Sequence, residues 1–280
     1  MTFVPSRRVV LASATGLLAT FGTHALAAPD TSHVVDASSD CGFRADAPGK
    51  VFSRGVAARP GFEFWRVRLL GRPPLASGLQ TAAEFIRKAK RPLTALAAME
   101  LRLPKPLPAA EFAALNVEYV KALVAAGFVV PGETRPEARS NMAPLYNAPD
   151  VFSLHAFTFA VPAPPGMQAA SPDYVISGKP ESTDAGGVIG GSDYSAPAMR
   201  VKASSILDWL TDRITELGGD PAHATAFQIY TALSLDSIVA DPFARSPLSR
   251  AEVTLIPGNP PVTGFQVEFD VRSVTREYAI

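Results

Sequence analysis

The sequence predicts an α+β protein built from two similar units that follow one another along the chain. The 280 residues are enough for two cores of ordinary size. Segments with apolar residues at helical spacing alternate with segments in which every second residue is apolar, the patterns of amphipathic helices and of strands. A similar order of such segments occurs on both sides of a proline-rich stretch at 163–172, which is the natural linker.

The C-terminal unit begins its clearest part with a helix. From Met199 to Leu217 the apolar residues recur every three or four positions, and charged residues occupy the opposite face. Ser195 is placed to cap the start of this helix, and Gly218 with Gly219 is a strong signal for its end. The pattern therefore predicts a helix over 195–217.

Three strands are predicted after that helix. Apolar and polar residues alternate over 227–233 and more strictly over 265–272, while the strand over 250–257 is expected to end at Pro257 and Gly258. In 265–272, four apolar side chains share one face and four polar side chains share the other. The polar face is therefore predicted to reach solvent or a subunit interface.

The N-terminal unit shows a looser version of the same order. A strand over 65–70 precedes a helical pattern at 76–90 that Pro92 stops. A second helix over 109–125 is predicted from the spacing of its apolar stripe, and the apolar run 152–161 predicts a closing strand.

Residues 1–27 have the features of a twin-arginine export signal. Arg7 and Arg8 precede a mildly apolar run, and Ala25, Leu26 and Ala27 form a small-residue cleavage pattern. The alternative, a membrane anchor, is disfavoured because the run contains Gly, Ser, Thr and His and falls short of about 18 unbroken apolar residues. We therefore expect a periplasmic or secreted protein without a membrane partner once the signal is cleaved.

Charge and composition exclude several classes of partner and site. The first 27 residues hold two basic and no acidic side chains, so 24 of the 26 basic residues remain against 26 acidic ones. A near-neutral chain without a basic run gives no reason to expect nucleic acid as a partner. Cys41, the only cysteine, excludes an internal disulfide, and its polar surroundings predict an incidental surface residue. With no HxxxH or CxxC spacing, neither a metal site nor a cofactor is predicted.

Other polar motifs carry less chemistry. The glycine-rich segment 186–191 lacks the Lys-Ser/Thr of a phosphate-binding loop, so a flexible loop is predicted there. His33 lies in an N-terminal extension over 28–45 that is expected to be mobile. His223 follows the long helix beside Pro221 and is predicted to be an exposed loop residue.

Five segments of the C-terminal half carry a family resemblance through their order and spacing. They are a strand that ends in Ser-Gly at 175–180, the helix end at 216–219, and the strands at 226–230, 249–253 and 267–271. Together they resemble the Rid, or YjgF-like, family of enamine and imine deaminases. Residues 138–141 resemble the arginine strand of the same family a second time.

The resemblance implies two tandem chorismate-mutase-like (Rid-type) domains, each a mixed β-sheet with helices on one face. The first, over 46–162, is more divergent than the second, over 173–280. It also implies a homo-oligomer built on trimers, with sites between neighbouring domains.

Family roles can be carried over to named residues of the second domain. The resemblance implies that Arg250 pairs with a substrate carboxylate and that Glu268 positions or activates water. A guanidinium can hold a carboxylate through two parallel hydrogen bonds, and a nearby carboxyl can move protons during hydrolysis. Ser177 and Gly178 are placed to offer backbone N–H groups. The alternative for Arg250 and Glu268 is an ion pair on the polar face of the sheet.

The first domain departs from the pattern. Arg139 and Asn141 stand in a good match to the arginine strand, but the expected glutamate is replaced by a segment that ends in His155. Three alternatives remain: His155 transfers the proton, the site binds without turnover, or the histidine is structural.

The resemblance implies a cofactor-free hydrolytic deaminase of a small carboxylate that bears an enamine or imine, and its tandem form implies an aminomuconate-like substrate. The alternative is a non-catalytic small-molecule-binding or scaffold protein of the same fold.

Overall fold

The computed structural model describes residues 31–37, 40–129, 133–166, 169–183, 185–234 and 236–280, without the side chains of 236–239. The expected export signal at 1–27 lies outside the described residues. The helices are α1 (Leu75–Lys88), α2 (Ala109–Ala125), α3 (Ala196–Glu216) and α4 (Asp236–Arg245), with short 3-10 helices η1 (Leu93–Ala95), η2 (Pro221–His223) and η3 (Pro247–Arg250). The strands are β1 (Val34–Asp36), β2 (Phe43–Asp46), β3 (Gly55–Ala58), β4 (Phe62–Arg68), β5 (Leu96–Arg102), β6 (Ala138–Pro144), β7 (Ser153–Pro162), β8 (Tyr174–Pro180), β9 (Ala226–Thr231), β10 (Glu252–Asn259), β11 (Val267–Ser273) and β12 (Arg276–Ala279).

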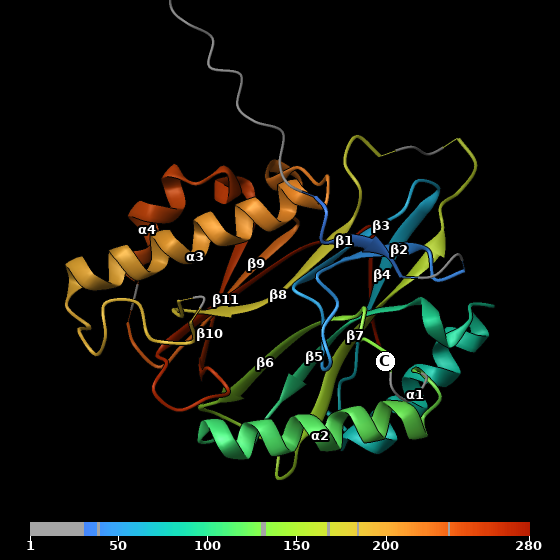
Figure 1. Cartoon of the computed structure of the whole chain (residues 1–280), viewed down its shortest axis with the longest axis horizontal. Helices are drawn as coiled ribbons and strands as arrows, with labels where there is room; N and C mark the ends of the chain where they lie inside the picture. The colour runs from blue at the N-terminus through green and yellow to red at the C-terminus, as the bar shows by residue number, and fades with distance from the viewer. Residues whose placement is uncertain (1–30, 38–39, 130–132, 167–168, 184, 235) are drawn as a thin grey trace, which may run out of the picture.

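The same βαβαββ unit occurs twice (Figure 1). We call 62–162 the first repeat and 174–273 the second repeat. The strand order is β4-β7-β5-β6 in the first and β8-β11-β9-β10 in the second. In both, the fourth strand of the unit runs antiparallel between the first and second strands, and the second and third strands are parallel. The α+β arrangement of two similar units predicted from the sequence is confirmed.

The two sheets are joined and exchange their outer strands. All twelve strands follow one another in a single order, and β10 meets β6 through the pairs Gly258–Pro144 and Asn259–Ala143. Strands β1 to β3 extend the second repeat through β8, whereas the C-terminal β12 lies parallel to β4 of the first repeat. The hydrogen bonding thus crosses the boundaries that were predicted along the chain.

Helices cover the outer faces of both sheets (Figure 1). Helix α3 buries the predicted apolar stripe against the second repeat, and residues such as Ile206, Leu210 and Ile214 are fully buried there. Burying one such side chain contributes about 1.5 to 3 kcal/mol. Ser195 occupies the N-cap position of α3, but its side chain makes no capping hydrogen bond. The corresponding core of the first repeat lies under α1 and α2.

The inner faces of the two sheets are buried inside the molecule. The polar face of β11, expected to reach solvent or a subunit interface, is instead covered, and Glu268, Asp270 and Arg272 are 3%, 4% and 7% exposed. The expectation was wrong because the first repeat of the same chain supplies the cover. An apolar layer fills another part of this interior and contains Cys41, which is 1% exposed and not the surface residue that we expected.

Strand β5 was not recognised in the sequence. All seven of its residues are buried, so its letters show no alternation of apolar and polar residues. Among the described helices, none combines the length and apolar character needed to cross a membrane.

Candidate active site

Glu268 lies at the centre of the candidate site, on the inner face of β11. It stands opposite Tyr230 of β9 and Pro180 of β8 in the strand registers. Gly178 of β8 lies against its carboxyl group, and a Cβ atom at that position would come within 2.0 Å of Glu268 Oε1. Only glycine allows the carboxyl group to approach the backbone of β8 so closely.

The environment of Glu268 favours its neutral form. Burial, followed by the nearby Asp270 and Glu181, raises the pKa of this carboxyl group well above its usual range, and Arg139 and Arg102 oppose the rise. A charged carboxylate that is buried away from water without a close counter-ion is costly, so Glu268 retains its proton. A carboxyl group that retains its proton to higher pH in this way is suited to act as a general acid.

Arg139 approaches this region from β6 of the first repeat. The side chain is 2% exposed, and its Nη2 donates a hydrogen bond to Asn116 Oδ1 of α2 at 2.8 Å. The guanidinium carbon lies 4.6 Å from the ring centre of Phe52 and 4.7 Å from that of Tyr119. Within the described part of the chain, Nε and Nη1 have no acceptor. Buried donors of this kind leave a site where an anion is stabilised.

The backbone of β8 joins these two groups. Ser177 Oγ accepts a hydrogen bond from the backbone N–H of Arg139 at 2.9 Å and donates one to the carbonyl of Ser53 at 2.7 Å. Because Gly178 follows Ser177, the serine fixes the start of β6 beside the glycine that contacts Glu268. We expected the backbone N–H of Ser177 to be available to a ligand. It instead donates a hydrogen bond to the carbonyl of Arg54, so this part of the prediction is wrong.

Asn141 stands two residues after Arg139 on the same side of β6. It is 5% exposed, and its Oδ1 has no donor within the described residues. Arg139 and Asn141 pair with Met99 and Leu101 of β5, whose side chains belong to the core beneath α1 and α2. The first repeat thus supplies a cation and an amide, and the second supplies Ser177, Gly178 and Glu268.

The family of the chain follows from its similarity to known proteins. The family model described as 2-aminomuconate deaminase CnbZ matches residues 35–278. The chain belongs to this family. The 2-amino-5-chloromuconate deaminase of Comamonas testosteroni is 31% identical over 231 residues, which cover 81% of this chain and 91% of that relative. The predicted membership of a deaminase family is therefore confirmed, and the chain is an enzyme that acts on C–N bonds.

Similarity to solved structures is weaker. A chorismatase crystal structure matches 79% of this chain and 77% of its own, with a TM-score of 0.49 and 15% sequence identity. The YjgF gene product from E. coli matches 41% of this chain and 89% of its own, with a TM-score of 0.29 and 14% identity.

Two other predicted residues of this deaminase lie apart from that cluster. Arg250 is exposed in η3, where its charge acts on Asp220. His155 of β7 has a buried Nδ1 without a hydrogen-bond partner among the described residues. Burial, then the charge of Arg102, lowers the pKa of His155 to about 3, so the imidazole is neutral and weakly basic near pH 7. This environment does not favour proton transfer by His155.

Several groups around the deaminase site were not predicted. Asn116 and Phe52 hold the guanidinium of Arg139, and Arg102 acts on both Glu268 and His155. Tyr119 was recognised only as part of the apolar stripe of α2. The contacts of these side chains depend on how distant segments pack, and no local spacing signals them.

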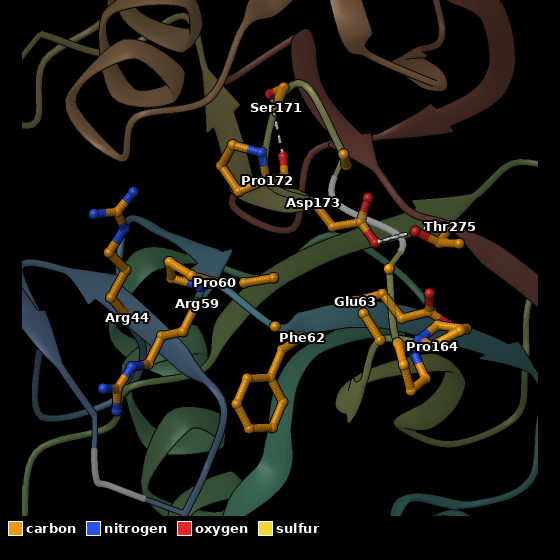
Figure 2. A pocket seen from close by; sticks show the side chains of 16 residues that line it. Arg44, Arg59, Pro60, Phe62, Glu63, Pro164, Ser171, Pro172, Asp173 and Thr275 are labelled. Carbon is orange, nitrogen blue, oxygen red and sulfur yellow. Dashed lines mark hydrogen bonds between the residues drawn. The ribbon is translucent and has the colours of Figure 1, made fainter.

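A cleft of about 750 Å³ lies elsewhere in the deaminase, between the turn that precedes β4 and the linker (Figure 2). Asp173 in its wall accepts hydrogen bonds from the backbone N–H groups of Phe64 and Thr275 and from the Thr275 hydroxyl. Figure 2 shows the guanidinium groups of Arg44 and Arg59 on the side away from Asp173 and Thr275. Neither Arg139 nor Glu268 is among the described residues that line this cleft.

His33 was expected to lie in a mobile extension, but it is held in place by two carboxylates. Its Nε2 lies 2.9 Å from Glu216 Oε2 and 3.2 Å from Asp46 Oδ1. These three ligand atoms are close enough for a metal ion. However, Arg54 lies 2.7 Å from Asp46, and Arg213 pairs with Glu216. These arginines already neutralise both carboxylates, so the group is best described as an ion-pair cluster.

Proposed function

We propose that this chain is a hydrolytic deaminase that needs no cofactor and acts on 2-aminomuconate or a close analogue, a six-carbon dicarboxylate with an enamine. The observation that carries the proposal is the meeting of Arg139 from the first repeat with Glu268 from the second in one buried region. The names of the family and of the Comamonas testosteroni relative support this class of substrate.

In the proposed complex, Arg139 binds the carboxylate next to the amino-bearing carbon. Its buried Nε and Nη1 groups gain acceptors, while Asn116 keeps the guanidinium in place through Nη2. A hydrogen bond to a charged group contributes about 1.5 to 3 kcal/mol. Asn141, on the same side of β6, faces the same region and can accept a hydrogen bond from the substrate amine through Oδ1.

Glu268 moves the protons in the proposed reaction. Its neutral carboxyl group donates a proton to the enamine carbon, which leaves an iminium at the neighbouring carbon. Water then attacks the iminium carbon, and the Glu268 carboxylate takes a proton from the attacking water. The resulting carbinolamine loses ammonia and forms the ketone. One water is consumed and one ammonia is released.

Arg102 is the proposed partner of the second carboxylate. It is 3% exposed, and its guanidinium carbon lies 5.7 Å from the ring centre of Tyr230, the neighbour of Glu268 across the sheet. Arg102 and Arg139 both act on the Glu268 carboxyl group. Glu268 is thus within reach of two separate cations, an arrangement that suits an extended dicarboxylate.

The test is ammonia release from 2-aminomuconate generated in situ. Glu268→Gln is expected to lower turnover by about a hundredfold or more, the typical contribution of a general acid or base. Glu252→Gln, which changes an exposed glutamate of β10, is the matched control and should leave turnover unchanged. Equal rates in both variants and the parent would refute the role of Glu268.

A second arm tests the dicarboxylate. Arg102→Met should raise KM for 2-aminomuconate at least tenfold while leaving a monocarboxylate enamine little affected. A parent enzyme that prefers the monocarboxylate would exclude the proposed substrate class.

Export and assembly complete the proposal. We propose a periplasmic or secreted protein, on the basis of the twin-arginine pattern, and a homo-oligomer built on trimers. The apolar side chains of Val253 and Leu255 on β10 are each 43% exposed, which suits a surface covered by another copy. Light scattering of the protein without residues 1–27 tests the assembly, and a monomer at micromolar concentration would refute it.

A further inference from the structure

Beside Arg139 lies a second buried acid that the proposed reaction does not use. Glu137 precedes β6 by one residue, is 2% exposed, and accepts a hydrogen bond of 3.4 Å from Tyr119 Oη. The ring of the same tyrosine lies 4.7 Å from the guanidinium carbon of Arg139. Tyr119 thus connects the carboxyl group of Glu137 with the cation that would bind substrate.

The location of Glu137 makes it, together with Glu268, a counter-ion of an empty Arg139. Among the described residues, the hydrogen bonds of the Arg139 guanidinium include only Asn116, a neutral acceptor, so its charge is balanced from a distance. A carboxylate that binds to Arg139 brings a second negative charge into the same buried region. Two carboxylates around one cation in a medium of low dielectric repel each other, and one of them gains a proton.

We propose that Glu137 is a positioning residue of the Arg139 site and takes up a proton when a substrate carboxylate binds there. The inference rests on the proposed function, because it takes Arg139 as the carboxylate-binding group. It assigns to Glu137 a role in the pH dependence of binding, separate from the proton transfers of Glu268.

The groups that face Glu137 support this role. They are Tyr119 from α2 and Arg135 and Arg139 from its own segment, and the backbone N–H of Ser53 binds the Glu137 carbonyl. Burial, which outweighs the two arginines, raises the pKa of Glu137 to about 7. The empty site is therefore about half protonated at neutral pH, so binding can change its protonation under ordinary conditions.

The direction of the effect follows from linkage. The bound state holds the proton more tightly than the empty state, so affinity is constant below pH 7 and falls as the pH rises above it. The fall approaches tenfold per pH unit at its steepest. Proton uptake at pH 7 should approach about half a proton per site.

The probe is muconate, hexa-2,4-dienedioate, which has both carboxylates but no amine to hydrolyse. Calorimetric titrations of the full chain in two buffers of different ionisation enthalpy give the number of protons taken up at each pH. We expect uptake by the parent and by Glu118→Gln, a control that changes a 67% exposed glutamate of α2. Glu137→Gln should take up fewer protons than the parent when it binds muconate, and its affinity should fall less steeply between pH 6 and 8.5; Glu268 accounts for any dependence that remains.

Tyr119→Phe provides a second variant that keeps the ring under Arg139. The tyrosine hydroxyl lowers the pKa of Glu137 through its hydrogen bond, so the loss of that hydroxyl should move the midpoint of the affinity profile to higher pH. A structural role for Tyr119 alone would change the affinity without moving the midpoint. This variant keeps the inference testable if Glu137→Gln does not fold.

Failure of the inference and failure of the proposed function give different results. If Arg139→Met binds muconate as tightly as the parent, the carboxylate site is elsewhere and both fail. If Arg139→Met loses binding but Glu137→Gln retains the proton uptake and the pH profile of the parent, only the role of Glu137 is refuted. An unshifted midpoint in Tyr119→Phe would refute it as well.

Discussion

The two repeats share a strand order but carry different chemistry at matching positions. On the helix side of β6, the first repeat has Arg139 and Asn141, which pair with core residues of β5. On the same side of β10, the second repeat has Val253 and Leu255, which pair with Phe227 and Ile229 in the core of α3. Each repeat thus keeps a part of the site that the other lacks.

On the fourth strand the second repeat carries the charged residues and the first repeat does not. The inner face of β11 carries Glu268, Asp270 and Arg272, whereas β7, the fourth strand of the first repeat, has the smaller and uncharged Thr158 and Ala160 on its inner face. A site that lies between two repeats requires one arginine strand and one acidic strand. Among the described residues one such pairing of strands forms the candidate site, and the matching positions of the other repeat are packing or surface residues.

The largest effect is expected at the glycine that the second repeat contributes. Gly178→Ala places a Cβ atom against the Glu268 carboxyl group, which must move away from β8. Turnover should fall by about a hundredfold or more, because misplaced catalytic groups lose that much. Gly71→Ala, where no atom lies within 4 Å of the added carbon, is the control. Steady-state ammonia release measures both, and equal rates would show that Glu268 does not act from this position.

The arginine strands provide the next test of the comparison. Arg139→Lys keeps the positive charge but loses the planar donor group. The transition state should lose about 1.5 to 3 kcal/mol of stabilisation, so kcat/KM should fall roughly 10- to 150-fold. Arg250→Lys changes an exposed side chain in η3 and should leave kcat/KM within about twofold of the parent. A large fall for Arg250→Lys with little change for Arg139→Lys would show that Arg250 binds the substrate carboxylate, as the family resemblance implied.

Most of the secondary structure and the two-unit order follow from local patterns. The helix over 195–217 and the strand over 265–272 match α3 and β11 within a few residues because burial imposes a period that is visible in the letters. The exchange of β1 to β3 and β12 between the repeats is not visible in this way. Strand pairing across more than a hundred residues leaves no periodic signal.

The site could be predicted in its parts but not in its assembly. Arg139, Ser177, Gly178 and Glu268 were all recognised by family resemblance, yet each domain was given its own set. Whether an arginine faces the glutamate of its own repeat or of the other depends on how the sheets pack. Phe52 and Asn116, which hold Arg139, are not part of any motif that marks a site, although Asn116 lies in a helix that was predicted.

The two titrating residues of the repeats should change the free energy of unfolding in opposite directions as the pH rises. His155, whose pKa is lowered to about 3, stabilises the fold above pH 6.5, and that stability is lost as the pH falls toward 3. Glu268, whose pKa is raised, destabilises the fold as the pH rises from about 4.5 through its folded value.

Urea unfolding across this range should therefore show two different changes. His155→Gln should reduce the loss of stability below pH 6.5 by up to about 1.4 kcal/mol per pH unit, and Glu268→Gln should reduce the loss of stability that begins as the pH rises above about 4.5. Profiles parallel to that of the parent in both variants would show that these two side chains do not titrate in the folded protein as their surroundings require.

The smallest effect separates the binding role of β6 from its role in folding. The Oδ1 of Asn141 is buried without a donor, which destabilises the empty protein by roughly 1 kcal/mol or more. Leucine is the residue at the matching position of β10, Leu255. Asn141→Leu removes the unpaired oxygen and its cost, so the free energy of unfolding should stay level or rise by about 1 kcal/mol. The affinity for 2-aminomuconate should nevertheless fall, because the substrate amine loses an acceptor. Leu255→Asn, at a position 43% exposed, should change neither quantity by more than about 0.5 kcal/mol. A destabilised Asn141→Leu variant with unchanged affinity would show that the asparagine serves the fold and not the substrate.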